Sequence, residues 1–290
     1  MMKSMLNYNS ASALRSFLEQ EGLGMRKKFG QNFLINPQIR KSLVEALGAK
    51  EPDEVWEIGP GLGAMTALLL ENKLKVKTFE IDSGFIRILK NIFSQEQNFS
   101  LVEGDVLKTW HKEPPAPFLL GNLPYNIAAA FLADLIEKKR FFSRMVVTVQ
   151  KETALRMSAS AGSKDYSSFS VLCASAYNVK PLMIIKRESF YPQPNIDSMG
   201  VLLEKKETRE YPPVFYPLVR ALFASRRKTI KNNLTGFLAS LGGKKRHGVP
   251  VNDVCASVFA ENRLDGNERA EKLDFDVFLS IAKSLDNMRL

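Results

Sequence analysis

Two short segments carry residue types suited to chemistry on a planar base. Asn122-Leu123-Pro124-Tyr125 combines an amide oxygen, backbone carbonyls and a flat ring. The run Glu57-Ile58-Gly59-Pro60-Gly61-Leu62-Gly63, earlier in the chain, places glycines at alternate positions. Glycine lacks a Cβ and accepts positive φ, so such a turn can approach a nucleoside closely. Together the two segments fit methyl transfer from S-adenosylmethionine to the N6 amine of an adenine.

The 122–125 segment, Leu123 included, is the candidate catalytic loop. An N6 amine is a poor nucleophile because its lone pair is delocalised into the ring. If the Asn122 oxygen and a backbone carbonyl of residues 122–124 accept its two N–H groups, the lone pair can point at the methyl group. Pro124 stiffens the loop and donates no N–H, and Tyr125 can stack on the base. The rate enhancement would then come from alignment and preorganised dipoles. Alone, this motif is better explained as an ordinary turn; its position just past the fourth strand, beside the glycine turn, favours the functional interpretation.

A second rigid aromatic segment is Phe190-Tyr191-Pro192-Gln193-Pro194. Phe190 is a candidate to pack against the other face or the edge of a base turned out of its stack. The alternative is a core aromatic residue in a proline-rich turn. Both interpretations stay open on the sequence alone.

The glycine turn lies in the context that a nucleotide-binding turn requires. Gly59, Gly61 and Gly63 follow an apolar strand and open a helix. Pro60, and the spacing G-x-G-x-G, disfavour a dinucleotide pyrophosphate. The acidic Glu57 before the glycines suits a cationic sulfonium better than a phosphate.

Two carboxylates follow the next two strands. Glu80 ends the second strand, at the place where an acidic group meets ribose hydroxyls in such folds. Asp105 ends the third strand, where it could accept from an adenine amine. Either residue alone is more often a solvated strand-end carboxylate, but their arrangement around the turn favours a cofactor site.

The secondary-structure elements expected around these segments alternate between strands and helices. Short apolar runs and longer helical periods are typical of βαβ units and a parallel sheet. Strands are expected at residues 55–58, 76–81, 100–103, 118–121 and 145–149, and helices at 63–71, 83–93 and 127–138. A helix at 170–179 and an antiparallel strand pair at 183–186 and 199–203 would close the sheet. After Tyr211-Pro212-Pro213, helices are expected at 217–241, 251–259 and 275–285, with no strand. The sequence therefore predicts an N-terminal extension (1–24), an α/β Rossmann-like S-adenosylmethionine-dependent methyltransferase domain (25–206) and a small all-helical RNA-binding domain (207–290).

Composition narrows the class of protein. The chain has 290 residues, 45% of them hydrophobic, which excludes a disordered chain. The two cysteines have no metal-binding spacing, and neither His111 nor His247 stands near a Ser or Cys nucleophile, so no metal site and no hydrolase triad are expected. No apolar run is long enough to span a membrane, and no signal pattern opens the chain. We expect a monomeric cytoplasmic protein.

The charge is +10 and unevenly spread, which favours a polyanionic partner. Between Tyr211 and Asn252 there are eight basic residues and no acidic one. Four of them are the candidate RNA-binding residues: Arg226, Arg227, Lys228 and Lys231. On the expected 217–241 helix, one of the two arginines would be held by packing while the other reaches phosphate. The alternative is a merely solvated face.

These motifs occur in an order that resembles a known family. The segments are Lys28-Phe29-Gly30-Gln31-Asn32-Phe33-Leu34, Glu57–Gly63, Glu80-Ile81-Asp82, Gly104-Asp105, Asn122–Tyr125, Phe190–Pro194 with Asp197-Ser198, Phe223-Ala224-Ser225-Arg226-Arg227-Lys228 and Arg269-Ala270-Glu271-Lys272-Leu273. They are similar to those of the ribosomal RNA adenine N6,N6-dimethyltransferases, most of all the bacterial small-subunit (16S) branch linked to kasugamycin sensitivity. Ala64-Met65-Thr66 and Thr153 depart from the commoner residues, and neither has a proposed role.

The resemblance implies a site and a substrate. Asn32 and Leu34 would lie over S-adenosylmethionine, with Gly59, Glu80, Asp105 and Asn122 completing its contacts. The substrate would be two adjacent adenines near the 3′ end of 16S rRNA, in the small ribosomal subunit. Residues 1–24 fall outside the resemblance and have no assigned purpose.

Two other functions remain open on the sequence. One is the same chemistry on 23S rRNA, which gives macrolide resistance. The other is a non-catalytic RNA-binding protein of the same fold, acting in ribosome assembly or as a mitochondrial transcription factor. Intact Asn122 and Tyr125 disfavour a protein that has lost catalysis.

Overall fold

The computed structural model describes residues 6–24, 31–207, 209–242, 245–246 and 249–288. The chain forms two compact units, one comprising residues 1–154 with 178–205 and the other 155–177 with 206–290. This division differs from the boundary predicted at residue 206, because the described part of segment 1–24 joins the first unit and residues 155–177 join the second.

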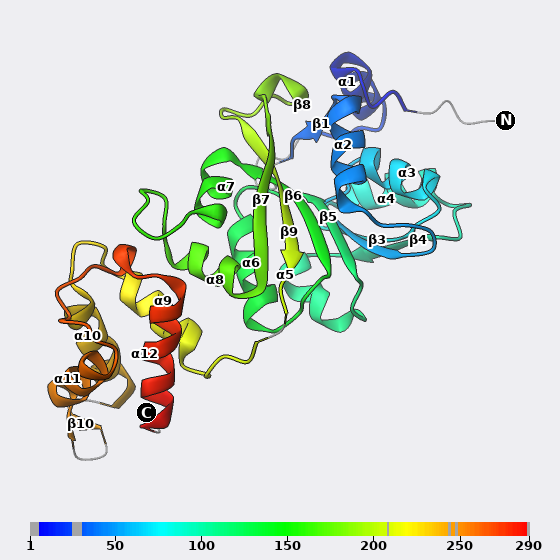
Figure 1. Ribbon diagram of the computed structural model, residues 1–290. Helices are drawn as coiled ribbons and strands as arrows, with labels where there is room; N and C mark the ends of the chain where they lie inside the picture. Colours follow the sequence, from blue (N-terminus) through cyan, green and yellow to red (C-terminus); the bar gives the residue numbers. More distant parts are fainter. Residues whose placement is uncertain (1–5, 25–30, 208, 243–244, 247–248, 289–290) are drawn as a thin grey trace. The chain divides into compact units, whose positions relative to one another are not determined.

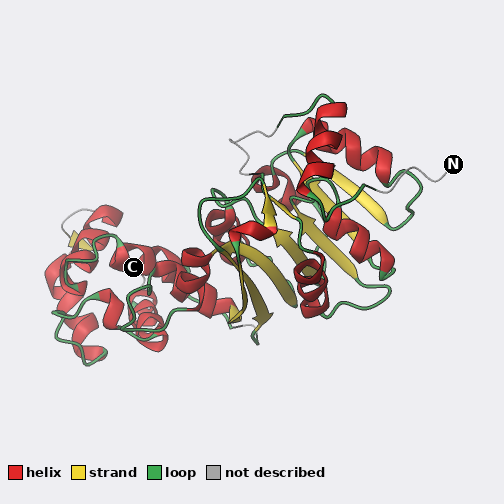
Figure 2. Cartoon of the chain, turned by 90° about the horizontal axis from the view of Figure 1, so that it is seen from above, coloured by secondary structure: helices red, strands yellow, loops and turns green. Residues whose placement is uncertain are grey.

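A seven-stranded sheet forms the centre of the first unit (Figures 1 and 2). Its strand order is β4 (Phe99–Glu103), β3 (Lys75–Glu80), β2 (Glu54–Ile58), β5 (Phe118–Asn122), β6 (Arg144–Gln150), β9 (Ser198–Lys205) and β7 (Tyr177–Ile185). The strands from β4 to β6 are parallel to their neighbours, and β9 runs antiparallel to β6. The predicted Rossmann-like α/β fold is confirmed.

The two faces of the sheet are apolar, as parallel strands require. On one face, Val55 and Leu120 pack in a cluster with Met65 and Leu69 of α3 (Ala64–Glu71) and with the buried apolar residues of α2 (Pro37–Leu47). The ring of Trp56, whose side chain points the other way from Val55, lies 4.8 Å from Phe79 and 5.3 Å from Phe142, centroid to centroid.

The remaining helices of this unit connect the strands. They are α4 (Ser83–Ile92), α5 (Val106–Thr109), the 3-10 turns η2 (Trp110–Lys112) and η3 (Arg187–Ser189), α6 (Ala128–Glu137) and the start of α7 (Lys151–Ser158). Asp82 begins α4, and its side chain accepts a hydrogen bond from the Gly84 N–H at 2.8 Å. Such a cap satisfies one of the N–H groups that a helix start leaves without a partner.

The N-terminal segment is an integral part of this unit. Helix α1 (Ala11–Gln20) buries Leu14 and Leu18 in a cluster with Leu62, Phe85 and Ile88. Strand β1 (Phe33–Leu34) pairs antiparallel with β8 (Phe190–Tyr191), so residues far apart in the sequence lie side by side (Figure 1).

The second unit is helical. Its elements are the end of α7, α8 (Ser168–Ala176), α9 (Phe215–Phe223), α10 (Ile230–Gly242), α11 (Val251–Glu261), the 3-10 turn η4 (Ala270–Lys272) and α12 (Phe275–Asn287). Tyr166 and Val171 are buried in its core together with residues of α9 to α12, which explains why residues 155–177 belong here.

Three predictions about elements are wrong. The expected helix 217–241 is two helices, α9 and α10, separated by residues 224–229. The expected helix 170–179 ends at Ala176, and the chain continues directly into β7. The tail contains a short strand pair, β10 (Lys245–Arg246) with β11 (Val249–Pro250).

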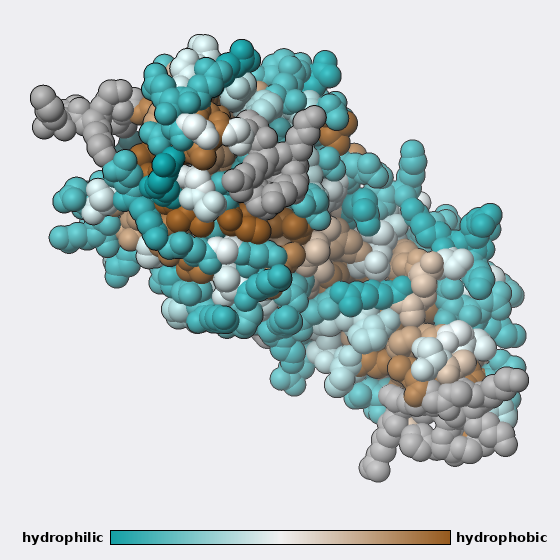
Figure 3. Space-filling model, turned by 180° about the vertical axis from the view of Figure 1, so that it is seen from behind, coloured by the Kyte–Doolittle hydropathy of each residue, from teal (hydrophilic) through white to brown (hydrophobic). Residues whose placement is uncertain are grey.

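In the view of Figure 3 most exposed side chains are hydrophilic, with apolar side chains gathered at a few places. Within the described residues, every helix is too short or too polar to cross a lipid bilayer.

Candidate active site

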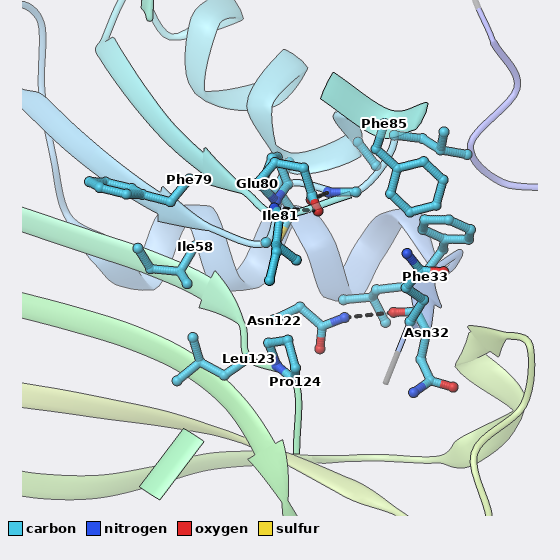
Figure 4. A pocket seen from close by; sticks show the side chains of 18 of the residues that line it. Asn32, Phe33, Ile58, Phe79, Glu80, Ile81, Phe85, Asn122, Leu123 and Pro124 are labelled. Carbon is cyan, nitrogen blue, oxygen red and sulfur yellow. Dashed lines mark hydrogen bonds between the residues drawn. The ribbon is translucent and has the colours of Figure 1, made fainter. Parts of the chain in front are cut away.

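The candidate site lies where the direction of the sheet's connections reverses. The chain passes from β2 to β3 on one side, whereas β5 pairs with β2 on the other side. Ligands of open α/β sheets bind at such a switch point, outside the carboxyl ends of the strands. A cavity of about 310 Å³ occupies this place, lined by the ends of β2, β3 and β5 and by the loops that follow them (Figure 4).

The glycine turn forms one wall and needs its glycines. Gly61 has φ +58°, and a Cβ there would lie 2.9 Å from the Phe33 ring. Gly63 has φ +89°, and its Cβ would lie 2.6 Å from Phe93. Both positions therefore exclude side chains through backbone conformation and through space.

Glu80 braces this turn from the end of β3. Its carboxylate accepts hydrogen bonds from the N–H groups of Ile81 at 2.9 Å, Asp82 at 2.8 Å and Gly61 at 3.3 Å. Burial raises the pKa of Glu80 to about 7, although these three bonds act in the opposite direction. Glu80 is 6% exposed and lines the cavity, so the residue predicted to meet the ribose also fixes the loop beside it.

Glu57 lies outside the cavity lining, under the turn. It is 0% exposed, and its Oε2 accepts a hydrogen bond from the Thr66 hydroxyl at 2.6 Å. Its other oxygen is buried without a partner among the described residues. Burial, and to a lesser extent the charge of Glu80, raise the pKa of Glu57 to about 7. The suggestion that Glu57 suits the sulfonium directly therefore does not match its position.

Asp105 stands on the cavity wall with Gly104 and Val106. It begins α5, and its Oδ1 accepts a hydrogen bond from the Leu107 N–H at 3.0 Å. This bond fixes the carboxylate at the end of β4, where the sequence predicts a contact with the adenine of the cofactor.

Asn122, at the end of β5, has a defined orientation. Its Nδ2 donates a hydrogen bond to the Asn32 backbone carbonyl at 2.7 Å (Figure 4). A carbonyl can only accept, so the amide nitrogen must face Asn32 and Oδ1 must face away. Among the described residues no donor is bonded to Oδ1, which leaves it able to accept from a substrate amine.

The carbonyls of the loop are not equivalent. The Pro124 carbonyl accepts the N–H groups of Ile127 at 3.0 Å and Ala128 at 3.1 Å, so it is committed to the start of α6. The Leu123 N–H donates to the Thr148 carbonyl at 3.0 Å, which fixes the backbone at Leu123. The peptide carbonyls of Asn122 and Leu123 are the other two in the predicted turn. The Leu123 carbonyl lies between the bonded Leu123 N–H and the bonded Pro124 carbonyl.

Tyr125 is held by its hydroxyl. The phenol oxygen lies 2.7 Å from the Ser198 hydroxyl. Burial raises the pKa of Tyr125, and the Ser198 hydrogen bond lowers it. The ring lines the cavity with its polar end bound to the protein.

Phe190 occupies a different environment from the one predicted. It is 3% exposed, pairs with Leu34 across β1 and β8, and packs in the core of the first unit. Phe190 is not among the residues that line the cavity in this structure. Stacking of its ring on a substrate base would therefore require β8 to move. The alternative, a core aromatic residue, describes this conformation.

Sequence reasoning missed part of the cavity wall. Tyr8, Leu14 and Arg40 line it, and the Tyr8 hydroxyl donates to the Leu62 carbonyl at 3.0 Å. The available signal was the i,i+4 spacing of Leu14 and Leu18 on α1, which indicates a helix with a buried face.

The other predicted cofactor residues do come together. Asn32, Leu34, Gly59, Glu80, Asp105 and Asn122 line one cavity with Leu123, Pro124 and Tyr125. Lys28, Phe29 and Gly30 lie outside the described residues. In the part of the chain that the structure describes, no group of three or more His, Cys, Asp or Glu side chains is arranged to hold a metal ion.

The candidate RNA-binding residues lie in the helical unit. Arg226, Arg227 and Lys228 occupy the turn between α9 and α10, rather than a helix. Arg226 donates to the carbonyls of Lys164 at 3.1 Å and Tyr166 at 3.3 Å. Arg227, Lys228 and Lys231 are exposed.

The chain is similar to a family of ribosomal RNA methyltransferases. The family model described as "Ribosomal RNA adenine dimethylase" matches residues 22–286. A protein of Treponema denticola named "Ribosomal RNA small subunit methyltransferase A" is 45% identical, over 97% of each chain. One of the same name from Borreliella burgdorferi is 38% identical, over 97% of this chain and 96% of the relative.

Two solved structures have similar folds. A dimethyladenosine transferase from Plasmodium falciparum has a TM-score of 0.73 and 28% identity, covering 88% of this chain and 98% of that one. The 23S rRNA methyltransferase ErmE has a TM-score of 0.63 and 19% identity, covering 87% of this chain and 99% of that one. The second likeness concerns the fold alone.

Proposed function

The chain belongs to the ribosomal RNA adenine dimethylase family, and we propose that it dimethylates the N6 amines of two adjacent adenines in a hairpin loop near the 3′ end of 16S rRNA, with S-adenosylmethionine as methyl donor. The family resemblance expected from the sequence is thereby confirmed. The chain is an rRNA methyltransferase, and its place in small-subunit maturation follows from this proposal.

The orientation of Asn122 carries the proposal. Its Oδ1 faces away from Asn32, and the Leu123 carbonyl lies in the same fixed turn. These two acceptors suit the two N–H groups of one amine, which would draw the nitrogen toward sp³. The nitrogen lone pair would then be free to point at the methyl group that the cofactor supplies. The amine loses its proton only afterwards, so a general base in contact with the amine is unnecessary.

The cavity suits the proposed cofactor. The glycine turn permits close approach, and Glu80 and Asp105 place acceptors at the ends of neighbouring strands. The cofactor supplies an electrophilic methyl group when bound. The chain's own residues then hold the amine, exclude water and align the two reacting atoms.

The small-subunit target is favoured over the large-subunit one. Several relatives that share most of their length with this chain are named small-subunit methyltransferases, whereas ErmE is 19% identical. We further propose that the helical unit provides the RNA phosphate contacts, through Arg227, Lys228 and Lys231.

Methyl transfer from labelled S-adenosylmethionine tests the proposal. Isolated small subunits whose rRNA lacks the two dimethyladenines should be labelled, at two adjacent adenines mapped by mass spectrometry. Protein-free 23S rRNA is the matched alternative substrate, and labelling of it alone would identify the resistance enzyme instead. RNA binding without any labelling would identify the non-catalytic assembly factor.

A further inference from the structure

We propose that Arg40 binds the carboxylate of the methionine portion of the cofactor; this inference rests on the proposed function. Arg40 lies in the first turn of α2 and lines the cavity. It is 5% exposed, although arginine is rarely buried without a charged partner.

Three hydrogen bonds already engage the guanidinium, which has five N–H donors. Nη1 donates to the carbonyls of Leu34 at 2.6 Å and Tyr8 at 3.4 Å, and Nη2 donates to Asn9 Oδ1. The Nε–H is buried and has no partner among the described residues. A guanidinium presents Nε and Nη2 along one edge, which is the edge that a carboxylate binds with two parallel hydrogen bonds.

The charge of Arg40 is also uncompensated within the described chain. Its bonded partners there are two carbonyls and an amide, and no described carboxylate forms an ion pair with it. Burial lowers the pKa of Arg40, against a smaller opposing effect of the Tyr8 phenol. A buried cation of this kind is costly until an anion reaches it.

A second feature of the same cavity favours an anion. Helix α3 begins at Ala64 after Gly63, which offers no side chain to cap it. Ala64 and Met65 line the cavity together with Arg40. A helix start presents N–H groups and a partial positive charge, so it is a second feature of the same cavity wall that favours the carboxylate of S-adenosylmethionine.

The competing explanation is that Arg40 only anchors the N-terminal segment through Tyr8 and Asn9. Two ligands distinguish carboxylate binding from anchoring of the segment. One is S-adenosylmethionine, and the other is its decarboxylated analogue, which keeps the sulfonium, the amine and the adenosine. Calorimetry on the full-length protein should show that the wild type binds the analogue about ten- to a hundredfold more weakly.

Arg40→Met should weaken S-adenosylmethionine binding by about the same factor and change the affinity for the analogue by less than about threefold. Arg40→Lys should recover part of the loss, because it keeps the charge. Tyr8→Phe is the matched control: it removes the hydrogen bond that anchors the segment to the Leu62 carbonyl, keeps every hydrogen bond of the guanidinium, and should affect both ligands equally.

Equal losses for both ligands in Arg40→Met would overturn the proposal and leave Arg40 as an anchor. Equal affinity of the wild type for the two ligands would overturn it without any variant, should the variants not fold. A wild type that binds neither ligand would refute the cofactor of the proposed function. Normal, carboxylate-dependent binding without RNA methylation would refute that function and support the role of Arg40.

Discussion

At the scale of single residues, Asn122 is the side chain on which methyl transfer should depend most. Asn122→Ala removes the Oδ1 acceptor and the hydrogen bond to the Asn32 carbonyl. We expect the single-turnover rate to fall about 10²- to 10³-fold, the scale measured for removal of one preorganised polar group. Filter binding should show unchanged RNA affinity, because the phosphate contacts that we propose lie in the helical unit. A near-normal rate would refute the role of the amide oxygen.

Tyr125 should act through its ring. Its hydroxyl is bound to Ser198, so Tyr125→Phe should keep most activity, whereas Tyr125→Ala should lose about 1–3 kcal/mol of base stacking at both methylation steps. Ser198→Ala removes the same hydrogen bond without touching the ring and should resemble Tyr125→Phe. Mass spectrometry of the modified loop measures both products. An inactive Phe variant beside an active Ser198→Ala would show that the hydroxyl itself contacts the substrate.

Glu57 should make stability depend on pH. Its pKa is raised from 4.5 to about 7 in the folded protein, so the native state binds more protons than the unfolded state between these values. The free energy of unfolding contributed by Glu57 is therefore fully present below about pH 4.5 and is lost as pH rises to 7, by an amount on the order of 3 kcal/mol. Urea unfolding of Glu57→Gln, whose amide oxygen can still accept from Thr66, should show a flatter pH profile. An identical profile would mean that Glu57 does not titrate in this range.

At the scale of elements, the glycine turn joins β2 to α3 and limits what can replace its residues. Gly61→Ala combines positive φ with a contact of 2.9 Å to the Phe33 ring. We expect S-adenosylmethionine affinity, measured by calorimetry, to fall by about tenfold or more. Gly162→Ala is the control, because Gly162 has φ +82° but nothing within 4 Å of a Cβ. It should lower stability without changing affinity; an equal loss of affinity in both would implicate general strain.

The element boundaries show what the sequence can predict. The strands that hold the site were predicted to within one residue, because short runs rich in apolar and β-branched residues, bounded by turn residues, mark strands. The break between α9 and α10 was missed, because it depends on tertiary hydrogen bonds. The Asn233 side chain donates to the carbonyls of Leu222 at 2.8 Å and Ser225 at 3.2 Å, which compensates for the lost helical bonds.

At the scale of the whole molecule, RNA affinity should depend steeply on salt. Neutralising Arg227, Lys228 and Lys231 together should reduce the slope of log K against log salt, by about 0.7–0.9 for each lost phosphate contact. Arg226→Ala is the contrasting variant: its Nη2 is bound to the carbonyls of Lys164 and Tyr166 and to the Glu271 carboxylate, so it should lower the melting temperature of the helical unit instead. An unchanged slope in the triple variant would place the RNA contacts elsewhere.

Only part of the candidate site could be predicted from the sequence, because residues from distant parts of the chain line the cavity. Motif residues such as Glu80 and Asn122 follow strands whose order the βαβ pattern implies, so their convergence could be foreseen. Tyr8 precedes α1 and Arg40 lies on α2, both before the first strand of that pattern, so their place at the cavity depends on how the N-terminal part of the chain packs. The same limit applies to Phe190, whose burial follows from the pairing of β8 with β1.

The helical unit consists of two separate parts of the sequence, so its two parts are synthesised at different times. Synthesis proceeds from the N-terminus at about 5–20 residues per second, so α8 is made before β7 and β9, and its partners in α9 to α12 are made last. A nascent chain that ends near residue 206 contains every strand of the large sheet. It also exposes Tyr166 and Val171, which are buried only once the later helices arrive. Such an intermediate would present apolar side chains to the cell, and we expect a chaperone to bind the nascent protein at this stage.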